Sequence, residues 1–155
     1  MFDFCIGITY NTTVKQYKIV LDTNIIYSAV RSKRGMAYRL LSMIDEYKYQ
    51  IQISVPLILE YEDVLKRNLA DLALSDSDIN DFIDYLCKAG EKRKIYYLWR
   101  PVLKDFKDDF ILELAVESEC DFIVTYNIKD FKGAEMFDIK VITPKEFLRK
   151  LGEKI

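Results

Sequence analysis

The side chains in this sequence with the clearest chemical potential are four carboxylates, those of Asp22, Glu60, Asp108 and Asp130. The chain contains no histidine, which excludes Ser-His-Asp and Cys-His nucleophile systems and His-ligated zinc or iron sites. Carboxylates that share one partly buried place repel one another and raise each other's pKa unless a cation neutralises them. Oxygen ligands alone select Mg²⁺ or Mn²⁺, and either ion can activate water for attack on a phosphate ester.

The segments around these acids predict strands that alternate with helices. Apolar or alternating runs predict strands at 18–22, 50–54, 94–99, 121–125 and 140–143. Helical spacing and helix-start signals predict a loop after residue 22 and then helices at 36–44, 54–69, 75–90, 108–119 and 144–151. This order favours βαβ units, and therefore a mainly parallel sheet with helices on both faces.

The acids fall at places that such a sheet brings together. Asp22, Asn127 and Asp130 follow the ends of predicted strands, and ligands bind beyond the carboxyl ends of parallel strands. Glu60 lies on an apolar stripe of its helix, and Asp108 begins a helix in line with its apolar positions. Each acid also has a structural interpretation. Asp22 could cap a helix, Asp108 could be a first-turn charge, and Glu60 could pair with a neighbouring base.

Length and composition predict one globular domain. The chain has 155 residues, of which 50% are apolar, and only 5 Gly and 3 Pro, which argues against disorder. We expect one domain over residues 18–155, preceded by an N-terminal arm or edge strand over residues 1–17. The net charge of -2 neither indicates nor excludes a nucleic-acid partner, because local patches matter more than the sum.

The three cysteines, Cys5, Cys87 and Cys120, lie far apart and form no C-x-x-C motif. They predict buried, reduced thiols and therefore a cytoplasmic protein. No apolar run approaches the roughly 20 residues of a membrane span, so we expect no membrane association. The first residues lack the basic and uninterrupted apolar regions of a signal peptide.

Five motifs, in order along residues 18–151, resemble the PIN domain, and most closely its VapC-like branch, whose members are predicted toxins of toxin-antitoxin systems. The motifs are V-L-D-T-N (20–24), I-S-V-P-L-I-L-E (53–60), D-F-K-D-D (105–109), C-D-F-I-V-T-Y-N-I-K-D-F (120–131) and V-I-T-P-K-E-F-L (141–148). The resemblance implies a five-stranded parallel sheet in a three-layer α/β/α sandwich. It also implies a Mg²⁺- or Mn²⁺-dependent ribonuclease that cleaves single-stranded RNA, a homodimer, and a small antitoxin partner.

The resemblance assigns roles to individual residues. Catalysis and metal binding fall to Asp22, Glu60, Asp108 and Asp130. Hydrogen bonding within the site falls to Asn24, Thr125 and Asn127. Asp109 is expected to contact the metal ligands without binding the metal itself. Many members have Asp where this chain has Asn127, whereas others share its N-x-x-D-F form. We therefore expect Asp130 to be the fourth acid.

A run of basic residues without an acid follows the first motif, and it consists of Arg31, Lys33, Arg34 and Arg39. We interpret it as an RNA phosphate-binding patch, although such a run can also be a solvated surface. Apolar faces in 36–48 and 77–87 are candidates for a dimer contact. Two other functions stay open: a non-catalytic PIN-like module that binds RNA or protein, and a small-molecule phosphohydrolase.

Overall fold

The computed structural model describes residues 16–95 and 106–155. Its centre is a five-stranded sheet in the order β3-β2-β1-β4-β5, and every neighbouring pair is parallel. The strands are β1 (Tyr17–Leu21), β2 (Tyr49–Ile53), β3 (Glu91–Lys92), β4 (Phe122–Val124) and β5 (Lys140–Ile142). The predicted parallel sheet is confirmed, and the predicted arm over 1–17 lies outside the described residues except for its last two.

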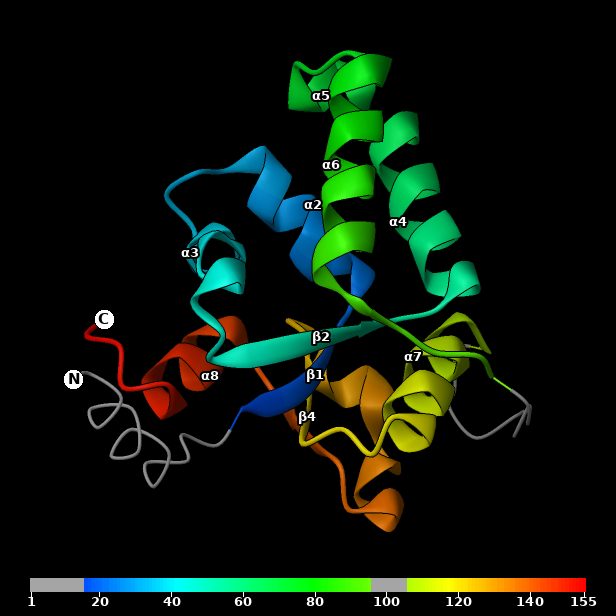
Figure 1. The fold of residues 1–155 in the computed structure, drawn as a ribbon, viewed down its shortest axis with the longest axis vertical. Coiled ribbons are helices and arrows are strands. Elements are labelled where there is room, and N and C mark those ends of the chain that lie inside the picture. Colours follow the sequence, from blue (N-terminus) through cyan, green and yellow to red (C-terminus); the bar gives the residue numbers. More distant parts are fainter. Residues whose placement is uncertain (1–15, 96–105) are drawn as a thin grey trace, which may run out of the picture.

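Helices cover both faces of this sheet (Figure 1). They are α2 (Thr23–Arg31), α3 (Met36–Ser42), α4 (Val55–Arg67), α5 (Leu69–Leu72), α6 (Asp76–Ala89), α7 (Phe106–Glu117) and α8 (Pro144–Lys150). Short 3₁₀ helices lie at Ile44–Glu46, Ile128–Phe131 and Ala134–Phe137. Helices α4 and α6 lie side by side and rise above the sheet in Figure 1, while α7 packs against β1, β2 and β4.

Capping signals in the sequence mark where several helices begin. The Ser54 side chain accepts a hydrogen bond from the Leu57 amide at the start of α4. Complete capping boxes open α6, at Ser75 and Asp78, and α8, at Thr143 and Glu146. Each box satisfies amides that the first turn of a helix leaves without partners, so the predicted starts of these helices are confirmed.

Two sequence predictions are wrong. The predicted loop after residue 22 contains α2, whose Ile25, Ile26 and Ala29 form a short buried stripe. The third strand begins at Glu91, and Lys94 is not in a strand. The remainder of the predicted strand at 94–99, beyond residue 95, lies outside the described residues. The prediction at 94–99 rested on the β-rich composition of that segment. In the structure, the residues that pair with β2 are those that directly follow the end of α6.

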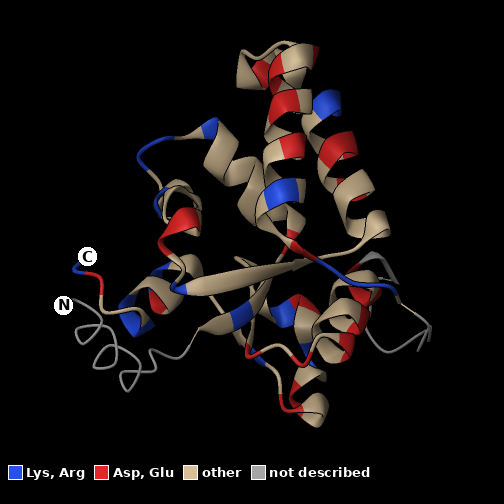
Figure 2. Cartoon of the chain, viewed as in Figure 1, with Lys and Arg blue, Asp and Glu red and all other residues tan. Residues whose placement is uncertain are grey.

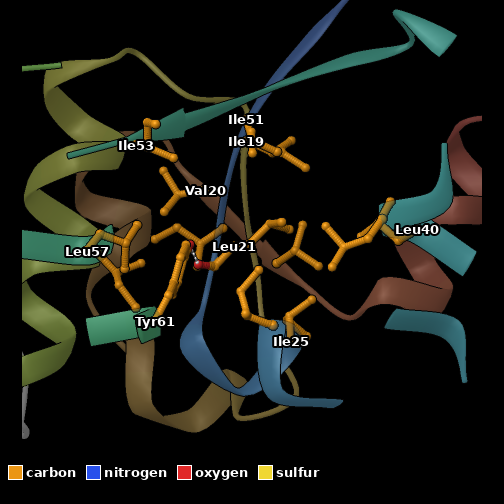
Figure 3. Packing of buried hydrophobic residues seen from close by; sticks show 14 of the residues in the cluster. Ile19, Val20, Leu21, Ile25, Leu40, Ile51, Ile53, Leu57 and Tyr61 are labelled. Carbon is orange, nitrogen blue, oxygen red and sulfur yellow. Dashed lines mark hydrogen bonds between the residues drawn. The ribbon is translucent and has the colours of Figure 1, made fainter. Parts of the chain in front are cut away.

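The core is centred on β1 (Figure 3). Ile19, Val20 and Leu21 are each at most 1% exposed. Side chains from β2 and from helices on one side of the sheet surround them, and these include Ile25, Leu40, Ile51, Ile53, Leu57 and Tyr61. The end of β1, which leads into Asp22, is therefore fully enclosed.

Replacing Gly90 with alanine is expected to reduce the free energy of unfolding by about 1–3 kcal/mol. An added Cβ would lie 3.0 Å from the Ile53 side chain and 3.0 Å from the Leu86 carbonyl oxygen, where α6 turns into β3. The matched control is Gly35→Ala, because a Cβ there meets only the Ser32 carbonyl oxygen at 3.6 Å. Urea unfolding of both variants measures the difference. Equal stabilities would contradict the expectation.

Candidate functional site

Asp22 and Thr125 directly follow the neighbouring strands β1 and β4, so both lie at the carboxyl edge of the sheet. Asp22 is 7% exposed and Thr125 is fully buried. The Thr125 hydroxyl donates a hydrogen bond of 2.6 Å to Oδ2 of Asp22. Asp22 occupies the N-cap position of α2, but its side chain makes no capping hydrogen bond. Asp22 thus stands at the start of α2 without a geometric capping hydrogen bond, and its carboxylate accepts a hydrogen bond from Thr125 instead.

Thr125 connects three polar residues that the sequence predicted for the site. Its oxygen accepts hydrogen bonds from the Asn127 amide at 2.9 Å and from Nδ2 of Asn24 at 3.4 Å. Its only proton goes to Asp22, because a hydroxyl carries one donor and two acceptor positions. The Tyr126 amide donates to Oδ1 of Asn24 at 3.5 Å, a contact that no sequence signal indicated. Asn24, Thr125 and Asn127 are thus gathered around Asp22.

The pKa of Asp22 is raised above its ordinary value, chiefly because burial disfavours the charged form. The hydrogen bond from Thr125 and the nearby amides of Thr23 and Asn24 act in the opposite direction. The negative charge of Asp130 raises the pKa further. Asp130 is exposed and lies in the 3₁₀ helix after β4, so the structure brings these two acids within electrostatic reach of each other.

The other predicted acids lie on two helices. Glu60 is half-buried on α4, between Leu57 and Tyr61, which are fully buried. Asp108 and Asp109 both lie in the first turn of α7, where Asp108 is half-buried and Asp109 is 1% exposed. The sequence aligned Asp108 with the buried side of this helix. In the structure its neighbour Asp109 is the more buried of the two.

In residues 16–95 and 106–155, no group of three or more acids or cysteines is close enough to hold a metal ion. Glu60, Asp108 and Asp130 therefore stay predictions as metal ligands beside Asp22. The donor set still fits Mg²⁺ or Mn²⁺, because Mg²⁺ commonly takes one or two carboxylates and fills its other positions with water and phosphate. Asp22 and Asp130 lie within electrostatic reach of each other and would be such a pair, with a buried carboxylate whose charge a cation would stabilise.

The basic run lies at the far end of α2 from Asp22, and Figure 2 shows it at the connection to α3. A nine-residue helix is about 13 Å long, which sets the separation between the two. Arg31, Lys33 and Arg34 are exposed, whereas Arg39 pairs with Glu153 at 3.3 Å. Of the four predicted RNA-binding residues, three are therefore exposed at the surface, and the fourth, Arg39, is held in an ion pair.

A groove of about 320 Å³ separates α3 from α6. Its mainly apolar lining consists of Ala29, Val30, Lys33, Tyr38, Leu41, Ser42, Leu74, Phe82 and Tyr85. The two segments predicted for a dimer contact, 36–48 and 77–87, both contribute to this lining. The structure therefore joins two faces that the sequence presented separately.

The described cysteines partly agree with the sequence prediction. Cys120 is buried and Cys87 is half-buried, and both are free thiols. Burial raises the pKa of Cys120 to about 12, so this thiol stays protonated at neutral pH. None of the described helices is long and apolar enough to cross a membrane.

Replacing Thr125 with valine is expected to raise the pKa of Asp22 further. Valine keeps the branched shape but cannot donate a hydrogen bond to the carboxylate, and such bonds stabilise the charged form. Titration of the aspartate carboxyl carbons by NMR measures the change. The control is Thr125→Ser, which retains the hydroxyl and is expected to stay closer to the wild type. A valine variant with an unchanged Asp22 titration would argue against this role for Thr125.

Comparison with known proteins agrees with the fold. The crystal structure of VapBC2 from Rickettsia felis, bound to a DNA fragment from their promoter, is similar in fold, with a TM-score of 0.57 and 17% sequence identity. The match covers 81% of this chain and 98% of the other. No match is found among curated proteins. The family model for the PIN domain matches residues 18–129, which is most of the chain, so this protein belongs to the PIN domain family.

Proposed function

We propose that this chain is a metal-dependent endoribonuclease that cleaves single-stranded RNA and acts as the toxin of a toxin-antitoxin pair. PIN domains are generally metal-dependent nucleases. The main support within this chain is the buried Asp22 carboxylate at the carboxyl edge of the sheet, held by Thr125 and close to Asp130. A buried acid with a second acid nearby favours a bound cation.

In this proposal Asp22 and Asp130 hold Mg²⁺ or Mn²⁺, Glu60 and Asp108 complete the acidic set, and Asp109 supports them from α7. When bound, the ion supplies an activated water and stabilises the charge that develops on the phosphate. Thr125 keeps one oxygen of Asp22 in a fixed position through its hydrogen bond. Asn24 and Asn127 hold Thr125 in turn.

RNA phosphates would bind the exposed basic residues at the end of α2, namely Arg31, Lys33 and Arg34. Arg39 belongs to this proposed patch by sequence, and its pairing with Glu153 makes its contribution the smallest. The patch begins about one helix length, roughly 13 Å, along α2 from Asp22, so it would hold a part of the strand away from the cut.

We further propose that the protein is cytoplasmic, that it forms a homodimer, and that it binds a small antitoxin protein. The free thiols of Cys87 and Cys120 support the location. The groove between α3 and α6 offers apolar surface for one of these partners. Size-exclusion chromatography with light scattering measures the oligomeric state directly.

A second candidate is a PIN-like module that binds RNA or protein without cleaving it. Two observations favour it. Residue 127 is Asn where many PIN domains have Asp, and no group of three acids gathers in the described parts of the chain. This module would shift RNA in a gel without cutting it.

The deciding experiment incubates a long, weakly structured RNA with purified protein in Mg²⁺, in Mn²⁺ and in chelator. We expect cleavage in at least one ion and none in chelator. The Asp22→Asn variant from the same preparation procedure controls for contaminating nucleases. RNA binding without cleavage in either ion, by a folded protein, would support the second candidate instead.

A further inference from the structure

Tyr61 lies on α4, is 1% exposed, and donates its hydroxyl hydrogen bond to the carbonyl oxygen of Leu21. Figure 3 shows this contact as a dashed line from the ring to the end of β1. The paired residues of β1 and β2 end at Ile19, two residues earlier. The Tyr61 hydroxyl therefore donates to the Leu21 carbonyl oxygen at a point beyond the last paired residues of β1 and β2.

The contact matters for Asp22 because of peptide geometry. The Leu21 carbonyl and the Asp22 amide belong to one planar peptide unit. The Asp22 amide donates to the Val124 carbonyl oxygen at 3.0 Å, which holds the opposite side of the same unit. The plane that leads into Asp22 is thus held at one side by α4 and at the other by β4.

We propose that Tyr61 is a positioning residue for Asp22, whose hydroxyl fixes the peptide plane that sets the direction of the Asp22 carboxylate. Thr125 then fixes the carboxylate itself from the β4 side. The two hydroxyls act on different bonds, so neither replaces the other. This inference rests on the proposed function, since the direction of Asp22 matters only where the carboxylate binds a ligand.

Two further observations agree with this role. Glu60, a proposed metal ligand, is the residue next to Tyr61 on α4, so one hydrogen bond ties its helix to the backbone of Asp22. The negative charge of Asp22 also contributes to raising the pKa of the Tyr61 hydroxyl, after the larger effect of burial, which places the two groups within electrostatic reach.

The test compares Tyr61→Phe with Tyr49→Phe. Tyr49 is 2% exposed, and its hydroxyl also donates to a backbone carbonyl, that of Leu40, at the other end of the sheet. Both variants keep the ring and lose one buried hydrogen bond, so their melting temperatures should fall by similar amounts. Mn²⁺ affinity, measured by calorimetry without RNA, is expected to fall on the order of tenfold for Tyr61→Phe and to stay near wild type for Tyr49→Phe.

Equal Mn²⁺ affinities for the two variants, in a wild-type protein that binds Mn²⁺ and cuts RNA, would overturn the role of Tyr61 alone. A wild-type protein that neither binds Mn²⁺ nor cuts RNA would overturn the proposed nuclease, and the inference with it. If Tyr61→Phe does not fold, 4-fluorophenylalanine at position 61 fills the space of the hydroxyl without donating a hydrogen bond, and the same comparison applies.

Discussion

Asp22→Asn is expected to reduce RNA cleavage on the order of 10³-fold and to raise the melting temperature in chelator. Asparagine has nearly the same shape and keeps an oxygen that can accept from Thr125. It removes a charge whose folded-state pKa is raised by burial, and such a charge at neutral pH opposes folding in the absence of a cation. Initial cleavage rates and calorimetric melting measure the two effects separately.

The matched control is Asp121→Asn, an identical substitution at the opposite edge of the sheet. Asp121 stands just before β4, where its Oδ2 accepts from the Lys18 amide at 2.9 Å. This variant is expected to cleave RNA at nearly the wild-type rate and to melt at a lower temperature. Full activity in Asp22→Asn, with its fold intact, would refute the nuclease proposal.

Asp130→Asn is expected to reduce cleavage roughly 10- to 100-fold and to lower the pKa of Asp22 towards its ordinary value. The second effect follows because the charge of Asp130 raises the Asp22 pKa, and removing a like charge reverses that contribution. Cleavage assays in Mn²⁺ and an NMR titration of Asp22 provide the two measurements.

The comparison at Asn127 decides which position supplies the fourth acid. Asn127→Ala retains the backbone amide that donates to Thr125, so its loss of cleavage is expected to be smaller than that of Asp130→Asn. The double variant Asn127→Asp with Asp130→Asn tests whether an acid at 127 restores cleavage. A larger loss at Asn127 than at Asp130 would show that the roles of these two residues are reversed.

Much of the fold was predictable because local signals and tertiary structure agree. Ser54, Ser75 and Thr143 cap helices that begin at the predicted places. Helix α2 was missed although its buried Ile25, Ile26 and Ala29 recur at helical spacing within nine residues. The third strand was misplaced because its two residues, Glu91 and Lys92, are not of types that favour strands. Their pairing with β2 follows from where the chain leaves α6 at Gly90.

The choice between Asp108 and Asp109 shows where periodicity fails. Every residue from Ile111 to Ala115 is buried, so α7 has no single apolar face. A helix enclosed on several sides gives no pattern from which the direction of one side chain can be read. The burial of Asp109 is therefore visible only in the folded chain.

The sequence by itself determined the parallel sheet and the grouping of Asp22, Thr125 and Asn127 at one edge, because strands that run in the same direction must end together. Only the tertiary structure decided which atoms meet. The Thr125 proton goes to Asp22, Tyr61 takes the Leu21 carbonyl, and the basic run lies a helix length away. These contacts depend on how closely separate elements pack, and packing distances across 40 or 103 residues leave no periodic trace in the sequence.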